Sequence, residues 1–328
     1  MDKLTTILVV ANRTEADRVL MRKAVLLARS VGARIHLFSC DAPLAKILHH
    51  AYSCEEGEKA WQICLGEHLA YLQGLKASMR APDVQISVDA SCYSPLYEGV
   101  LQQAAEIRPD LIMKSPSGVH PVQRFSFDAN DWHLMRSCPA ALMLVRSHPW
   151  RSLPKLAALV DVSEEGTERL NENIVHTAEY FALGCRGELD VVYSERSADI
   201  ELQKSRAEQF ARLAHEYRIA ASRRHVLGGD PDLTLPEFVA HQQYDAIVMG
   251  ALTHRRGIAS LGGTLTSGLV DALDCDFILV KRSGYERPAL TVSSARPDLK
   301  SASSLDRALP PRPAAIGSSA FWQSLLGR

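Results

Sequence analysis

The sequence predicts an α/β protein of two tandem, doubly wound domains, each a five-stranded parallel sheet with helices on both faces. Three observations favour this fold: the chain length, an internal repeat, and the alternation of short apolar runs with longer segments of helical period. At 328 residues the chain is too long for one small core, and it suits two domains with a further segment.

The internal repeat pairs three apolar runs of the first half with three of the second. Each run is short, rich in aliphatic residues and bounded by polar ones, which is typical of strands buried on both faces of a parallel sheet. The pairs are TTILVVANRT (5–14) with KLAALVDVS (155–163), RPDLIMK (108–114) with QYDAIVMG (243–250), and RSCPAALMLVR (136–146) with LDCDFILVKR (273–282).

Segments with helical spacing separate these runs. In the first half, helices are predicted over 15–31 and 55–80, from Ser94-Pro95 to about 107, and from Asn130-Asp131 onward. In the second half, helices are predicted over residues 167–183, 199–217 and 236–241. Alternation of strand and helix implies βαβ units with right-handed crossovers.

The domain boundaries follow from composition. Residues 148–154, HPWRSLP, hold two prolines without periodicity and form the predicted linker between domains 1–147 and 155–282. Residues 284–328 are rich in Pro, Ser, Ala and Arg, which predicts a disordered tail. Its last segment, AFWQSLLGR (320–328), is either a short docking motif or a frayed end.

Charge and cysteine content exclude several classes of protein. Lys and Arg total 37 against 38 Asp and Glu, so no basic excess favours nucleic acid or an anionic membrane. The N-terminus lacks the pattern of a secretory signal, and no apolar stretch has the ~20 residues of a membrane helix. Seven cysteines, never spaced C-x-x-C, indicate reduced thiols in the cytoplasm and no zinc ribbon. His49-His50 lack matching ligands, so no metal site is expected.

Ligands of an open parallel sheet bind where strand order reverses, outside the carboxyl ends of the first and fourth strands. In the second half these ends are Asp161 and Met249-Gly250. A polar, basic loop follows, and Gly263-Thr264 then opens a predicted helix. A glycine and a hydroxyl residue at a helix start present backbone N–H groups to phosphate oxygens.

This spacing resembles the nucleotide motif G-x2-G-x9-G-[ST] of the universal stress protein family, whose fold is Rossmann-like. Gly250, Gly263 and Thr264 match it, whereas Thr253 replaces the middle glycine. The segment NDWHLMRSCP (130–139) also resembles the first domain of a tandem member. The resemblance covers residues 3 to about 282. It implies bound ATP, with or without Mg²⁺, with Asp161 near the nucleoside and Val191 at the adenine, where Val191 is expected at the end of the second strand of this half, ELDVVY (188–193). It also implies that Met249, Gly250, Gly263, Thr264 and Leu265 follow the ribose and phosphates.

The first half lacks these features. Asn12 stands in place of Asp161, Lys114 is aligned with Gly250, and residues 114–130 contain no G-x9-G-[ST]. A lysine stem at a strand end would crowd a nucleotide, so one site per chain is expected.

The resemblance implies a nucleotide-binding stress sensor or adaptor with an unidentified protein partner. Two alternatives stay open: a slow ATPase in which His254, Arg255 or Asp161 orients water, and a module that binds a different small molecule. The last strands, 141–145 and 277–280, are the natural edges for pairing the halves as an internal pseudo-dimer, in a monomer or a homodimer.

Overall fold

The computed structural model describes residues 4–40, 55–92, 95–116, 128–163, 167–251 and 275–281, all within one compact unit. The predicted tail, 284–328, lies outside these residues. No helix among the described residues combines the length and the apolar character needed to cross a bilayer.

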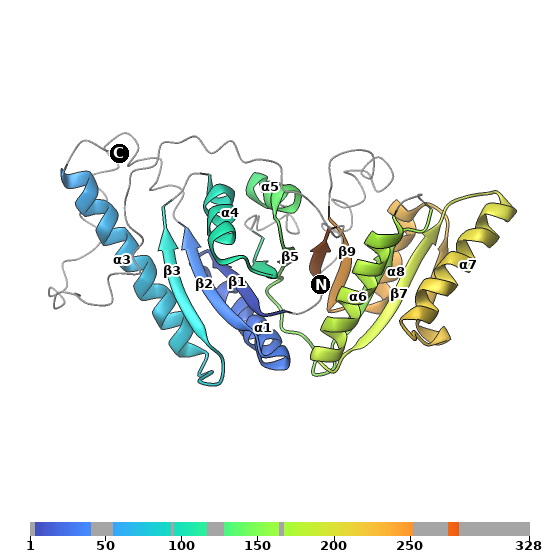
Figure 1. Ribbon diagram of the computed structural model, residues 1–328, viewed down its shortest axis with the longest axis horizontal. Coiled ribbons are helices and arrows are strands. Elements are labelled where there is room, and N and C mark those ends of the chain that lie inside the picture. Colours follow the sequence, from blue (N-terminus) through green and yellow to red (C-terminus); the bar gives the residue numbers. More distant parts are fainter. Residues whose placement is uncertain are drawn as a thin grey trace. The chain divides into compact units, whose positions relative to one another are not determined.

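The described strands form one ten-stranded sheet in the order β3-β2-β1-β4-β5-β10-β9-β6-β7-β8 (Figure 1). Within each half the neighbouring strands are parallel, and the first strand lies between the second and the fourth. This is the doubly wound order that the sequence predicts. The strands are β1 (Thr6–Ala11), β2 (Arg34–Cys40), β3 (Ile86–Ser91), β4 (Leu111–Lys114), β5 (Ala141–Leu144), β6 (Lys155–Val160), β7 (Glu188–Glu195), β8 (Arg224–Gly228), β9 (Ala246–Gly250) and β10 (Asp276–Val280).

The helices begin close to the predicted positions. Asp128 caps α5 through a reciprocal capping box with Asp131, and Asp199 caps α7 by accepting two backbone N–H bonds. The start predicted at Pro236 is wrong, because α8 already begins at Pro231. The helices are α1 (Ala16–Val31), α3 (Glu55–Ser78), α4 (Leu96–Ile107), α5 (Ala129–Ser137), α6 (Glu168–Gly184), α7 (Ile200–Glu216) and α8 (Pro231–Gln242), with a 3-10 turn at Ala221–Arg223.

Both faces of the central strands of the sheet are buried. On one face, alternate strand residues such as Leu8 and Val10 join a core cluster with side chains of α4, α5 and α8. Ile7 and Val9 point to the opposite face and are equally inaccessible, and α1 contacts β1 there. Burial on both faces explains why the strands read as continuous apolar runs.

The two predicted edge strands pair with each other. β5 and β10 run antiparallel, and Met143 faces Ile278 in the register. Ala141 and Asp276 are equivalent positions, because each pairs with the first residue of the fourth strand in its half. Met143 and Ile278 follow these residues by two and are therefore equivalent as well. A local two-fold axis therefore passes between Met143 and Ile278.

A buried ion pair fastens the second half to the first. Lys23 of α1 donates to both carboxylate oxygens of Asp276 at 2.9 and 2.7 Å, and neither side chain is exposed by more than 3%. The backbone N–H of Arg146 and the indole N–H of Trp150 also donate to this carboxylate, each at 2.7 Å. Trp150 belongs to the predicted linker, so α1, the linker and β10 share one carboxylate. The domain boundary itself stays a prediction.

Candidate functional site

The described part of the second half brings the ends of β6 and β9 together, as the sequence predicts. Strand order reverses here, since β6 lies between β7 and β9. Ala158 pairs with Val248, so the chain leaves the two strands side by side at Asp161 and Gly250. This is the crevice position at which doubly wound sheets bind ligands.

Asp161 is half-buried and held in a tight turn. Its Oδ1 accepts hydrogen bonds from the backbone N–H of Ser163 at 2.8 Å and from the Ser163 hydroxyl at 2.5 Å. Asn171 of α6 brackets its backbone: the Asp161 N–H donates to Asn171 Oδ1, and Asn171 Nδ2 donates to the Asp161 carbonyl. The carboxylate is therefore fixed at the strand end before any ligand arrives.

Gly250 and Met249 are expected along the ribose and phosphates, but their side-chain positions are covered by other parts of the chain. A Cβ on Gly250 would lie 3.0 Å from Cδ2 of Leu170, so the absence of a side chain here makes room for Leu170 of α6. Met249 is 3% exposed and belongs to the core cluster. Only the backbone of Met249 is thus available to a ligand at this strand end.

Val191 does not end its strand, and that part of the prediction is wrong. β7 continues to Glu195, and Val191 pairs with Ala158 in the middle of the sheet, where it is fully buried. The polar residues Ser194 and Glu195 resemble the start of a loop in the sequence. They extend the strand because hydrogen bonds satisfy the buried carboxylate.

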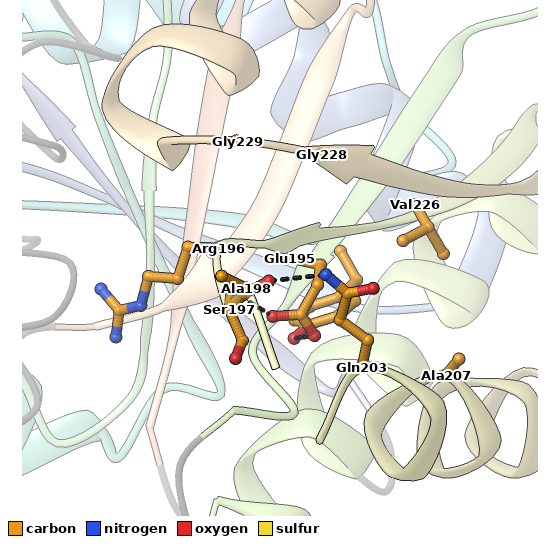
Figure 2. Close-up of a pocket in the computed structure, with 10 residues that line it drawn as sticks. Glu195, Arg196, Ser197, Ala198, Gln203, Ala207, Val226, Gly228 and Gly229 are labelled. Carbon is orange, nitrogen blue, oxygen red and sulfur yellow. Dashed lines mark hydrogen bonds between the residues drawn. The ribbon is translucent and has the colours of Figure 1, made fainter. Parts of the chain in front are cut away.

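A pocket of about 540 Å³ opens at the ends of β7 and β8, beside α7 (Figure 2). Sequence reasoning missed it, because its lining comes from three separate elements. Gly229, at φ +114°, turns the chain after β8, a conformation that favours glycine. The pocket is lined by Tyr193, Glu195, Arg196, Ser197, Ala198, Gln203, Ala207, Val226, Gly228 and Gly229.

Glu195 is the most constrained group of this pocket. Tyr193 donates to its Oε2 at 2.7 Å, while the Ser197 N–H and Arg206 donate to Oε1 at 2.7 and 2.9 Å. Burial raises the pKa of Glu195, but these three hydrogen bonds outweigh it and hold the pKa below its usual value. Burial and the bond to Glu195 raise the pKa of Tyr193. At neutral pH the pocket therefore contains a carboxylate and a phenol.

Arg206 connects the pocket to the switch point. Its Nη1 bonds to Glu195, and its Nη2 donates to the Ser163 carbonyl at 3.4 Å. Ser163 in turn holds the Asp161 carboxylate. The charge of Asp161 also contributes, after burial and Glu195, to the raised pKa of Tyr193. A chain of hydrogen bonds thus links the pocket to the end of β6.

The remaining predicted site residues lie outside the described part of the chain and stay predictions. They are Thr253, Gly263, Thr264 and Leu265, together with His254 and Arg255.

The first half corrects one alignment. The backbone N–H of Asp110 bonds to the Thr6 carbonyl and that of Asp245 to the Lys155 carbonyl, so the two aspartates are equivalent. Counting onward, Lys114 corresponds to Met249, and Ser115 corresponds to Gly250. The predicted match of Lys114 with Gly250 is off by one residue, because the two sequence runs differ in length.

Lys114 fills the end of its strand in an unexpected way. Its ammonium lies 2.7 Å from Oδ1 of Asp131 and 3.0 Å from the Ser115 carbonyl, and both charged side chains are fully buried. Asp131 stands in the first turn of α5, where its second oxygen accepts the Asp128 N–H. The helix start that would receive a phosphate already holds a carboxylate of the chain itself.

Asn12 closes the remaining gap in the first half. Its amide donates to the Ser115 carbonyl at 3.3 Å and so links the ends of β1 and β4. Ser115 is 5% exposed. In the second half the equivalent Asp161 turns back to its own loop instead, and no described side chain makes the corresponding link to β9.

Comparison with known proteins agrees with this architecture. Residues 171–281 match the model of the universal stress protein family. The chain is 22% identical over 306 residues to universal stress protein E of Escherichia coli K12. This match covers 86% of this chain and 95% of that protein.

Two solved structures share the fold. A protein of unknown function from Pseudomonas aeruginosa PAO1 has a TM-score of 0.69 at 20% identity, over 85% of this chain and 93% of that one. A universal stress protein from Archaeoglobus fulgidus has a TM-score of 0.61 at 12% identity, over 84% and 98%. The chain therefore resembles universal stress protein E over most of its length, and residues 171–281 carry the sequence signature of the universal stress protein family.

Proposed function

We propose that the protein binds one adenine nucleotide, ATP or ADP with or without Mg²⁺, at the switch point of its second half. In this proposal it acts in the cytoplasm as a stress-response sensor or adaptor. Similarity to universal stress proteins supports the stress-response role. The contrast between the halves supports the choice of site: internal hydrogen bonds and an ion pair fill the first switch point, whereas the described part of the second is lined by Asp161 and an adjoining pocket.

The nucleoside would lie across the ends of β6 and β7. Asp161 offers a fixed carboxylate, which suits the hydroxyl donors of a ribose. The adjoining pocket of about 540 Å³ falls within the usual size range of small-molecule sites. Tyr193, Ala198 and Val226 supply apolar surface, and Gln203 supplies an amide for a polar edge.

The phosphates would extend from Gly250 to the predicted helix start at Gly263-Thr264. Backbone N–H groups at such a start, with the positive end of the helix dipole, favour anions. In the first half the carboxylate of Asp131 takes the equivalent position and would repel a phosphate. The buried pair of Lys114 with Asp131 therefore argues against a phosphate at the helix start of the first half.

Titration of the purified full-length chain with ATP by calorimetry tests this proposal. We expect one site per chain with micromolar affinity, which corresponds to roughly −8 kcal/mol. Native mass spectrometry of the same preparation counts bound nucleotides independently. Absence of heat and of a bound mass would overturn the proposal, whereas slow release of phosphate would add ATPase activity to it.

A further inference from the structure

Two cysteines of the first half lie in contact at the edge strand of the sheet, away from either switch point. Cys64 on α3 is 5% exposed and packs against Trp61 and Cys92. Cys92 directly follows β3 and is half-buried. α3 contacts β3 and runs along this edge strand (Figure 1). The two residues belong to a small cluster distinct from the main core.

This arrangement suits thiol oxidation for two reasons. Disulfide geometry requires the two Cβ atoms to be about 3.5–4.5 Å apart, and side chains already in contact need little backbone movement to reach it. The two thiols also differ in access: Cys92 is half-buried, whereas Cys64 is buried. A partly accessible thiol beside a second, buried one is the arrangement of a reactive and a resolving cysteine.

We propose that Cys64 and Cys92 form an oxidisable dithiol that reacts with peroxides. Hydrogen peroxide transfers one oxygen to the Cys92 thiolate, which becomes a sulfenic acid, and the other oxygen leaves as hydroxide. The Cys64 thiolate then attacks the Cys92 sulfur, the S–S bond forms, and the sulfenic oxygen leaves as a second hydroxide. The two thiol protons convert both hydroxides to water, so two thiols and one peroxide give one disulfide and two waters. Two equivalents of a cellular thiol then reduce this disulfide by exchange through a mixed disulfide, and they are themselves oxidised to a disulfide.

Other described cysteines lack this combination. Cys138 and Cys275 are packed inside the main core and are at most 3% exposed. Burial raises the pKa of the Cys185 thiol to about 12, which keeps it protonated and unreactive. Cys40 is half-buried and ends the neighbouring strand β2, but it packs against the main core. Cys40 therefore serves as the matched control, a half-buried thiol that packs against the main core and not in the cluster of Cys64 and Cys92.

The test uses the reduced full-length chain, exposed to hydrogen peroxide, denatured, labelled with a maleimide and mapped by peptide mass spectrometry. We expect the loss of two thiols and a Cys64–Cys92 linkage that dithiothreitol reverses. In Cys64→Ser the Cys92 sulfenic acid should persist and react with a 1,3-dione, while Cys40→Ser should still lose two thiols. Retention of all thiols in the wild type, or a linkage between any other pair, would overturn the proposal. The wild-type peptide map decides the matter even where a variant fails to fold, and it is independent of nucleotide binding.

Discussion

Replacing Lys114 with methionine tests whether the first switch point is held closed by a buried charge pair. Methionine keeps the length and the apolar stem but removes the ammonium, which takes away the ion-pair partner of the fully buried Asp131 carboxylate. Removing one partner of a buried pair costs about 3–5 kcal/mol. For a chain of this size that corresponds to a fall in Tm of roughly 5–9 °C.

The assay is urea and thermal unfolding of four proteins: the wild type, Lys114→Met, Asp131→Asn and the double variant. We expect each single variant to lose stability and the double variant to recover most of it, because no buried charge is then left unpaired. Arg29→Met is the matched control, since its pair with Asp83 is about half exposed on both sides. It should leave the unfolding midpoint unchanged. A Lys114→Met protein as stable as the control would refute the buried pair.

Three further predictions concern other parts of the chain. Lys23→Met should destabilise the protein by about 3–5 kcal/mol in urea unfolding, and it should add almost nothing when Asp276→Asn is already present; additive losses would contradict the shared carboxylate. Because the pKa of Glu195 is lowered in the folded state, this carboxylate contributes stability above its unfolded-state pKa and loses that contribution as pH falls through its folded-state pKa. Glu195→Gln should therefore flatten the acid side of a curve of Tm against pH. An unchanged slope would argue against this role of Glu195. Gly263→Val should abolish ATP binding in calorimetry with an unchanged circular dichroism spectrum, whereas equal binding would locate the site elsewhere.

The fold follows from the sequence because its strands are buried on both faces. Such strands read as short aliphatic runs, and the runs recur in both halves. The predicted strand 188–193 ends too early, because the buried carboxylate of Glu195 breaks the aliphatic pattern near the true end of β7. Its hydrogen-bond partner Arg206 lies on a different element, so nothing local in the sequence indicates that the strand continues.

The candidate site was predicted only where it follows from the positions of strand ends. Asp161 and Gly250 could be located because they end the first and fourth strands of their half. The ion pair of Lys114 with Asp131 could not, because Asp131 reads locally as part of a helix cap and its second role depends on spatial contact. The pocket beside α7 could not be predicted for the same reason, because β7, β8 and α7 are brought together only by folding.

The proposed function requires that the second switch point binds the nucleotide and that the first does not. Its most direct test is calorimetric titration of full-length Asp161→Asn and Asn12→Asp with ATP, because each substitution gives one half the residue of the other. A hydrogen bond to a charged group contributes about 1.5–3 kcal/mol, so Asp161→Asn should weaken binding by roughly 10- to 150-fold. Asn12→Asp should leave affinity and the stoichiometry of one unchanged. Equal effects of the two substitutions, or weakening by Asn12→Asp alone, would contradict the account.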